Sequence, residues 1–154
     1  MRWLKDNIIR TYNVNDFEFV GFDLVEVLAD KLNVTLSGKL PRRIKDLYDI
    51  YFITTNYDFT ASDIAYRLDT KYNISDRIKE PLGFLLNIED CRQAYERFRG
   101  IPGNTDFQTT LDKVIEFITP ILTIIYTHGR KEYYWKKGHD GQRYWSETKG
   151  EDIV

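Results

Sequence analysis

The chain has 154 residues, of which 42% are apolar and 30% are charged, so it is long enough for one folded domain with a sizeable core. Its 22 basic and 24 acidic side chains give a net charge of -2, which excludes a polycation that binds nucleic acid through bulk charge. An aromatic content of 15%, with only 4 Pro and 9 Gly, excludes a disordered chain.

The chain shows no signal for export or for a membrane. A single cysteine, Cys91, cannot form an internal disulfide, and the first residues lack the apolar core of a signal peptide. The most apolar run, residues 114–126, is interrupted by Glu116 and Pro120 and is shorter than the roughly 20 residues that cross a bilayer. We therefore expect a cytoplasmic protein without membrane contact.

Two helices are predicted in the first third of the chain, after a short alternating stretch at residues 17–20 that is typical of a strand. Asp23 and Glu26 form a pattern related to a capping box, and Ser37-Gly38 supplies a stop, which predicts a helix over residues 23–37. Pro41 suits a first helical turn, and apolar side chains then recur at helical spacing, which predicts a second helix over residues 40–54.

Three further helices and a hairpin are predicted downstream. Residues 60–63 resemble a helix start for residues 64–71, and residues 88–99 are typical of a helix that ends at Gly100. Thr105 and Gln108 form a capping box for a long helix, which Pro120 is expected to kink or divide. Residues 132–136 and 142–145 flank a glycine-containing turn, which predicts a β-hairpin.

The predicted fold is mainly α, a bundle of about five to six helices closed by a C-terminal β-hairpin. One domain over residues 1–154 is expected to consist of a lead-in (1–20), a helical body (21–128) and a hairpin tail (129–148).

Charged residues concentrate on the predicted second helix. Asp46 and Asp49 are three residues apart and share one face, and Arg42 and Lys45 lie four residues before them and can pair with them. Spacing alone favours a solvated face with weak ion pairs. Lys31 differs because its helical neighbours are apolar. Its ammonium either extends past the edge of the core to water or points into a cleft, where a phosphate or Asp46 could meet it.

Other reactive side chains carry no recognisable motif. His128 and His139 lack the spacing of zinc ligands, so no metal site is expected, and Cys91 is expected to be a small buried apolar residue. The segment 100–103 is interpreted as a helix stop rather than a phosphate-binding loop.

The tail interleaves basic and aromatic residues. One interpretation is nucleic-acid contact, with phosphates held beside a stacking surface. The other, slightly favoured, is that the aromatic residues pack against the helices while the basic residues face water. The basic candidates are Arg130, Lys136, Lys137 and Arg143.

Two adjoining segments resemble the later motifs of the AbiEii/AbiGii toxin family of nucleotidyltransferases. Residues 24–32 read LVEVLADKL, similar to the family helix with an AEKL pattern, and residues 43–51 read RIKDLYDIY, similar to its KDxYDIY helix. The resemblance extends more loosely to about residue 145.

This resemblance implies a toxin-type nucleotidyltransferase that uses a magnesium-bound nucleoside triphosphate, modifies tRNA in some members and is neutralised by a cognate antitoxin. Lys31 matches the lysine that engages the nucleotide phosphates, and Asp46 matches the catalytic-site aspartate. Arg43 and Lys45 match neighbouring nucleotide-binding positions, with support from Asp49 and, beside the motif, Arg42.

The family's earlier half, which bears a Gly-Ser motif and metal-binding acidic residues, is not found in this sequence. Gly21 is followed by Phe22 rather than by Ser. Phosphoryl-type transfer depends on positioned cations, so we expect an inactive C-terminal portion, a truncated homologue or a separately encoded half, with no cofactor held by this chain alone. Two other classes stay open: a non-catalytic module that binds RNA or protein through the hairpin, and a remnant that dimerises.

Overall fold

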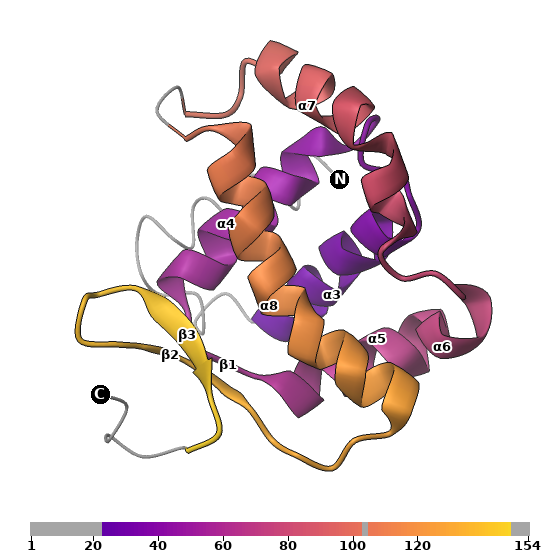
Figure 1. Ribbon diagram of the computed structural model, residues 1–154, viewed down its shortest axis with the longest axis vertical. Helices are drawn as coiled ribbons and strands as arrows, with labels where there is room; N and C mark the ends of the chain where they lie inside the picture. The colour runs from indigo at the N-terminus through magenta and orange to yellow at the C-terminus, as the bar shows by residue number, and fades with distance from the viewer. Residues whose placement is uncertain (1–22, 103–104, 149–154) are drawn as a thin grey trace.

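The computed structural model describes residues 23–102 and 105–148, and within them the fold is mainly α (Figure 1). The predicted strand at 17–20 and the lead-in lie outside the described residues. The six α-helices of this part are α3 (Leu24–Leu36), α4 (Ile44–Asn56), α5 (Ala61–Tyr72), α6 (Ile74–Arg77), α7 (Ile88–Arg97) and α8 (Phe107–Thr127). This confirms the predicted helical bundle.

Helix α8 is the long central element and crosses in front of α4 and α5 in Figure 1. Val114, Phe117, Ile121 and Ile125 recur at helical spacing and are buried against the other helices. Burying such a stripe is the main favourable contribution that a helix makes to folding.

Three short strands form an antiparallel sheet in the order β1 (Phe59–Thr60), β2 (Tyr134–Lys137) and β3 (Arg143–Ser146). Strands β2 and β3 are the predicted hairpin. Strand β1 was not predicted, because two residues between helices are too few to show an alternating pattern. It pairs Phe59 with Trp135 and so joins the helical body to the tail.

An aromatic cluster fastens the sheet to the helices. The Trp135 side chain is completely buried, and its ring centroid lies 4.9 Å from that of Phe117 and 5.1 Å from that of Trp145. Trp135 donates its indole N–H to the Thr54 carbonyl at 2.6 Å, and Trp145 donates to the Phe117 carbonyl at 2.9 Å. Both indoles thus combine apolar burial with a satisfied donor. The two tryptophans of the tail thus pack against the helices, as the slightly favoured interpretation expects. Its other half, that the basic residues face water, is wrong for Arg143, whose side chain is 13% exposed.

The N-terminal boundary of α3 agrees with its sequence signals, and that of α4 does not. Asp23 caps α3 by accepting from the amides of Val25 and Glu26. Helix α4 begins at Ile44 rather than at residue 40, because the amide of Arg43 bonds back to the Leu40 carbonyl in a tight turn. Pro41 therefore lies in that turn and not in the first turn of the helix.

The later boundaries also differ in detail. Asp106, rather than Thr105, caps α8 through the amide of Thr109. The helix continues through Pro120 undivided, and the Thr119 hydroxyl donates to the Ile115 carbonyl beside it. Helix α7 ends at Arg97, two residues before the predicted end. Helix α6 and the 3-10 helix η1 (Gly83–Asn87) were not predicted, because both are too short to show a period.

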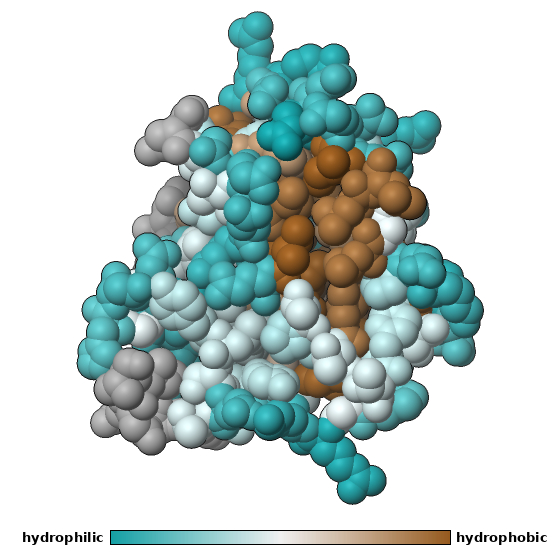
Figure 2. Space-filling model, viewed as in Figure 1, coloured by the Kyte–Doolittle hydropathy of each residue, from teal (hydrophilic) through white to brown (hydrophobic). Residues whose placement is uncertain are grey.

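Part of the surface is apolar. Figure 2 shows a broad apolar area beside α8 on the face seen in Figure 1. Among the described residues, Leu82 is 41% exposed and Leu86 is 89% exposed. None of the helices in this part of the chain has the length and apolar composition to span a bilayer.

Candidate functional site

The two residues that the resemblance marks most strongly meet between α3 and α4. Lys31 comes from the middle of α3, and its Nζ lies 3.1 Å from Oδ1 of Asp46 on α4. The same Nζ lies 2.9 Å from Oδ2 of Asp49, one helical turn further on. Asp46 and Asp49 therefore share the ammonium of Lys31, although they lie 15 and 18 positions after it in the sequence.

Two further cations complete a five-residue group that we call the charge cluster: Lys31, Arg43, Lys45, Asp46 and Asp49. The Lys45 Nζ lies 2.9 Å from the second Asp49 oxygen, and an Arg43 nitrogen lies 2.8 Å from the second Asp46 oxygen. Three cations thus face two carboxylates, which leaves the cluster with one excess positive charge.

Most of the charge cluster is buried. Lys31 is 2% exposed and Asp46 is fully buried, whereas the Arg43 side chain remains 36% exposed. The expectation of a solvated face with weak ion pairs is therefore wrong, because α3 packs over the carboxylates of α4 and covers them. Lys31 meets Asp46, one of the partners that its apolar neighbours suggested. Solvent reaches the cluster from the side of Arg43, and Arg42 is exposed next to it.

Tyr48 adjoins the cluster, and sequence reasoning passed over it. Its ring centroid lies 5.6 Å from the Lys45 ammonium. Burial, and then the neighbouring Tyr51 and Asp49, raise the pKa of the Tyr48 phenol above its ordinary value. The phenol therefore stays protonated at neutral pH. The signal was available, because Tyr48 lies inside the motif at residues 43–51.

The donor set suits phosphate better than metal. Within residues 23–102 and 105–148, no group of three or more His, Cys, Asp or Glu side chains is arranged to hold a metal ion. The charge cluster, in contrast, carries excess positive charge and an accessible guanidinium, whose fork geometry matches phosphate oxygens. Among the described residues, the charge cluster therefore offers donors to an anion rather than ligands to a metal ion.

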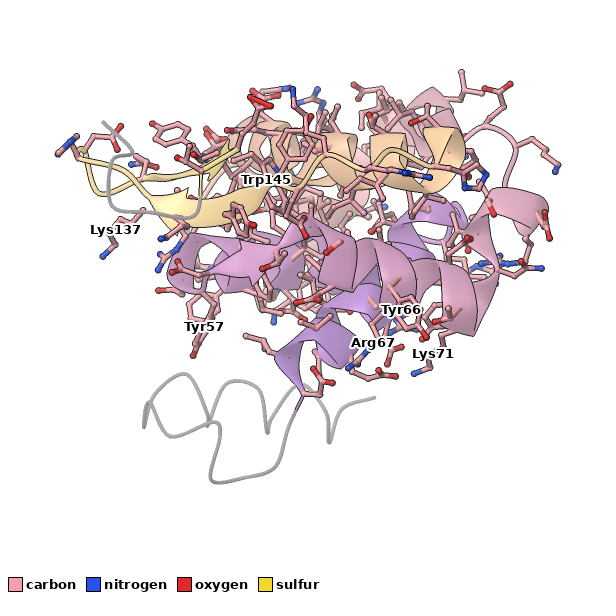
Figure 3. The ribbon with its side chains drawn as sticks, turned by 90° about the horizontal axis from the view of Figure 1, so that it is seen from below. Tyr57, Tyr66, Arg67, Lys71, Lys137 and Trp145 are labelled. Atoms are coloured by element: carbon pink, nitrogen blue, oxygen red, sulfur yellow. The ribbon has the colours of Figure 1, made fainter. Side chains whose placement is uncertain are left out.

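The basic residues of the tail do not form one surface. The Arg143 guanidinium lies 2.9 Å from Asp58 and donates to the Thr55 carbonyl at 2.7 Å, and its side chain is only 13% exposed. It clamps the hairpin to the end of α4. Lys136 is half-buried, whereas Lys137 and Arg130 are exposed, and Figure 3 shows Lys137 at the far end of the hairpin from Trp145.

Lys113 is a tail partner that sequence reasoning missed. Its ammonium lies 5.2 Å from the Trp135 ring centroid and 4.8 Å from that of Tyr144, and it donates to the Arg143 carbonyl at 2.9 Å. No local pattern could have found these contacts, because Lys113 lies alone on α8, far from the hairpin in sequence.

The remaining candidates lie apart from the charge cluster. Cys91 is buried, and this burial raises the pKa of its thiol, as expected of a small core residue. His128 terminates α8 in the left-handed conformation, with φ of 53°.

Comparison with known proteins adds no relative: no protein-family model, no curated protein and no solved structure matches the chain. The resemblance of residues 24–32 and 43–51 to a known family therefore rests on the sequence of those residues.

Proposed function

We propose that this chain is the C-terminal helical half of a nucleotidyltransferase of the AbiEii/AbiGii toxin type, with the charge cluster as one wall of the nucleotide site. One observation carries the proposal. Lys31 and Asp46, which match the phosphate-binding lysine and the catalytic-site aspartate of that family, come from different helices and lie 3.1 Å apart.

Each member of the cluster has a distinct proposed role. Asp46 and Asp49 hold the Lys31 ammonium from two sides and fix its position. Arg43 holds the other Asp46 oxygen and is the member that solvent reaches, so incoming phosphate oxygens would meet it first. Its guanidinium can bind a phosphate bidentately, and the excess positive charge of the cluster favours a polyanion.

Transfer chemistry requires groups outside the described residues. A magnesium ion bound with the triphosphate would neutralise charge on its oxygens, and carboxylates from an N-terminal half are the proposed ligands. A cognate antitoxin and a tRNA substrate belong to this proposal as the partners of the completed enzyme. The chain by itself is expected to bind a nucleotide without transferring it.

Calorimetric titration of each nucleoside triphosphate with magnesium tests the proposal on the full chain. We expect measurable binding, lost in Lys31→Met and about tenfold weaker in Arg43→Ala, because a charge-assisted contact is removed. Arg97→Ala is the matched control, since Arg97 is an exposed arginine on α7 and is not a member of the charge cluster. Circular dichroism shows whether each variant is folded.

The result that contradicts the proposal is equally definite. If the wild type binds none of the four nucleotides, or if Arg43→Ala and Arg97→Ala weaken binding alike, the charge cluster is no nucleotide wall. Salt-sensitive RNA binding that is lost on changing Lys136, Lys137 and Arg143 to Glu would then favour the hairpin as an RNA-binding module.

A further inference from the structure

A pocket of about 290 Å³ lies between α5 and the end of α8, and the proposed function does not use it. One wall comes from successive turns of α5, which place Ser62, Tyr66 and Asp69 on the same side of that helix. The other wall is the last turn of α8 with His128 and Gly129. One face of α5 and the C-terminal end of α8 therefore form the pocket.

Two features of the lining favour a cation over an anion. Asp69 is the one carboxylate among the described lining residues, and no lysine or arginine lines the pocket with it. The second feature is the C-terminus of the 21-residue helix α8, whose last carbonyls have no intrahelical donor. The last turn of α8 contains no basic side chain that would neutralise this helix end.

Asp69 has bonding capacity left for a ligand. One of its oxygens accepts from the amide of Ser75 at 3.0 Å and from the Ser75 hydroxyl at 2.9 Å. The other oxygen receives only a longer contact, of 3.2 Å, from the same hydroxyl. A carboxylate offers about four acceptor positions, so Asp69 is held in place without being saturated.

The rest of the lining is apolar and aromatic. Ala65 and Ile125 are buried at the floor between the helices, with Ile124 beside them. The Tyr66 side chain stands 67% exposed at the rim of the pocket, on the outside of α5 in Figure 3. The face of an aromatic ring at the rim can attract a cation, and the apolar floor suits an alkyl chain.

We propose that this pocket binds a small aliphatic cation, with its ammonium or guanidinium between Asp69 and the carbonyl end of α8. The alkyl chain lies along Ala65 and Ile124, and the Tyr66 ring covers the charged group. A free amine and the side chain of a lysine or arginine in a peptide share this chemistry.

Titration of the labelled full chain with butylamine and butylguanidinium, followed by amide chemical shifts, tests the site. We expect saturable shifts at Asp69, Thr70 and Gly129. Neutral butanol and anionic butyrate are the matched ligands, and both are expected to bind at least about tenfold more weakly, because each lacks the charge-assisted contact. A capped lysine amide that binds as well as butylamine identifies a peptide side chain as the source, whereas weaker binding identifies a free amine.

Three variants make the assignment specific. Asp69→Asn keeps an acceptor for Ser75 and is expected to weaken butylamine binding about tenfold. Tyr66→Ala, at an exposed position that does not threaten the fold, is expected to weaken it about threefold. Asp63→Asn, an exposed carboxylate on α5 outside the lining, should leave affinity unchanged. Equal binding of butanol, or equal losses in Asp69→Asn and Asp63→Asn, overturns the cation site.

Discussion

Helix α3 is joined to its two neighbours by ion pairs of the same residue types in opposite surroundings. On the α4 side, Lys31 meets two carboxylates that α3 and α4 bury between them. On the α5 side, Glu26 and Asp30 pair with Lys71 at the surface, and Arg67 lies 2.6 Å from Glu26. Figure 3 shows Arg67 and Lys71 side by side at that edge.

The two regions contain the same kind of ion pair and differ in how far solvent reaches the charged groups. Exposed pairs exchange water contacts for protein contacts at little net gain, and salt screens them. Buried charges have lost their water, so each depends on its partners, and removing one leaves the others uncompensated. The α3–α4 contact is therefore the sensitive one, although more charged residues pair between α3 and α5.

The largest expected effect is that of Lys31→Met, which preserves the length of the side chain and removes its charge. We expect a loss of about 3–5 kcal/mol in the free energy of unfolding, because Asp46 and Asp49 remain buried. Denaturant titration measures it. The double change Lys31→Met with Asp46→Leu should recover much of the loss, since Asp49 keeps Lys45. A double variant as unstable as the sum of its parts would contradict the comparison.

Arg43→Ala is expected to have an intermediate effect, a loss of about 1–2 kcal/mol. It removes a charged contact to the buried Asp46, but the guanidinium is 36% exposed, so water can replace it in part. The same denaturant titration, run beside Arg97→Ala, separates this loss from the general effect of removing an arginine. A loss as large as that of Lys31→Met would show that solvent does not reach this side of the cluster.

Lys71→Met is expected to cost less, about 0.5–1 kcal/mol, because it removes exposed pairs with Glu26 and Asp30. The diagnostic measurement is salt dependence. In 1 M sodium chloride, where the screening length falls to about 3 Å, this loss should nearly disappear while that of Lys31→Met persists. Equal sensitivity to salt in both variants would remove the distinction between the two regions.

The smallest expected effect is the loss of stability in acid that protonation of Glu26, in the α3–α5 contact, would cause. The hydrogen bond from Lys71 lowers the pKa of Glu26 below its ordinary value of 4.5. The folded state therefore gains stability from this carboxylate above pH 4.5 and loses it as the pH falls through the lower, folded value. Wild type and Glu26→Gln should differ by a few tenths of a kcal/mol at about pH 6 and converge once the pH has fallen below the folded pKa of Glu26. A difference that persists in acid would contradict this assignment.

Local signals predicted the helices, and long-range packing decided the rest. Asp23 and Ser37 bound α3 as their residue types indicate, because a cap is made within a few residues of its helix. The apolar neighbours of Lys31 revealed that its charge needed a partner. The burial of Asp49 could not be predicted, because it depends on how α3 packs over α4.

The same limit applies to the tail. Arg143 looked like a candidate for nucleic acid because its neighbours in sequence are basic and aromatic. Its partners, Asp58 and the Thr55 carbonyl, lie 85 and 88 residues away and leave no local pattern. Pro41 misled for the opposite reason, since proline suits a turn as well as a first helical turn.

The hydrogen bond from Trp135 to the Thr54 carbonyl closes a loop of 81 residues, and this sets an order of events during synthesis. At roughly 5–20 residues per second, the ribosome makes the end of α4 about 4–16 s before the tryptophan that covers it. During that interval Phe59 lacks Phe117, which is itself made late in the interval, and its strand partner Trp135. The arrival of the hairpin ends the exposure of that side chain.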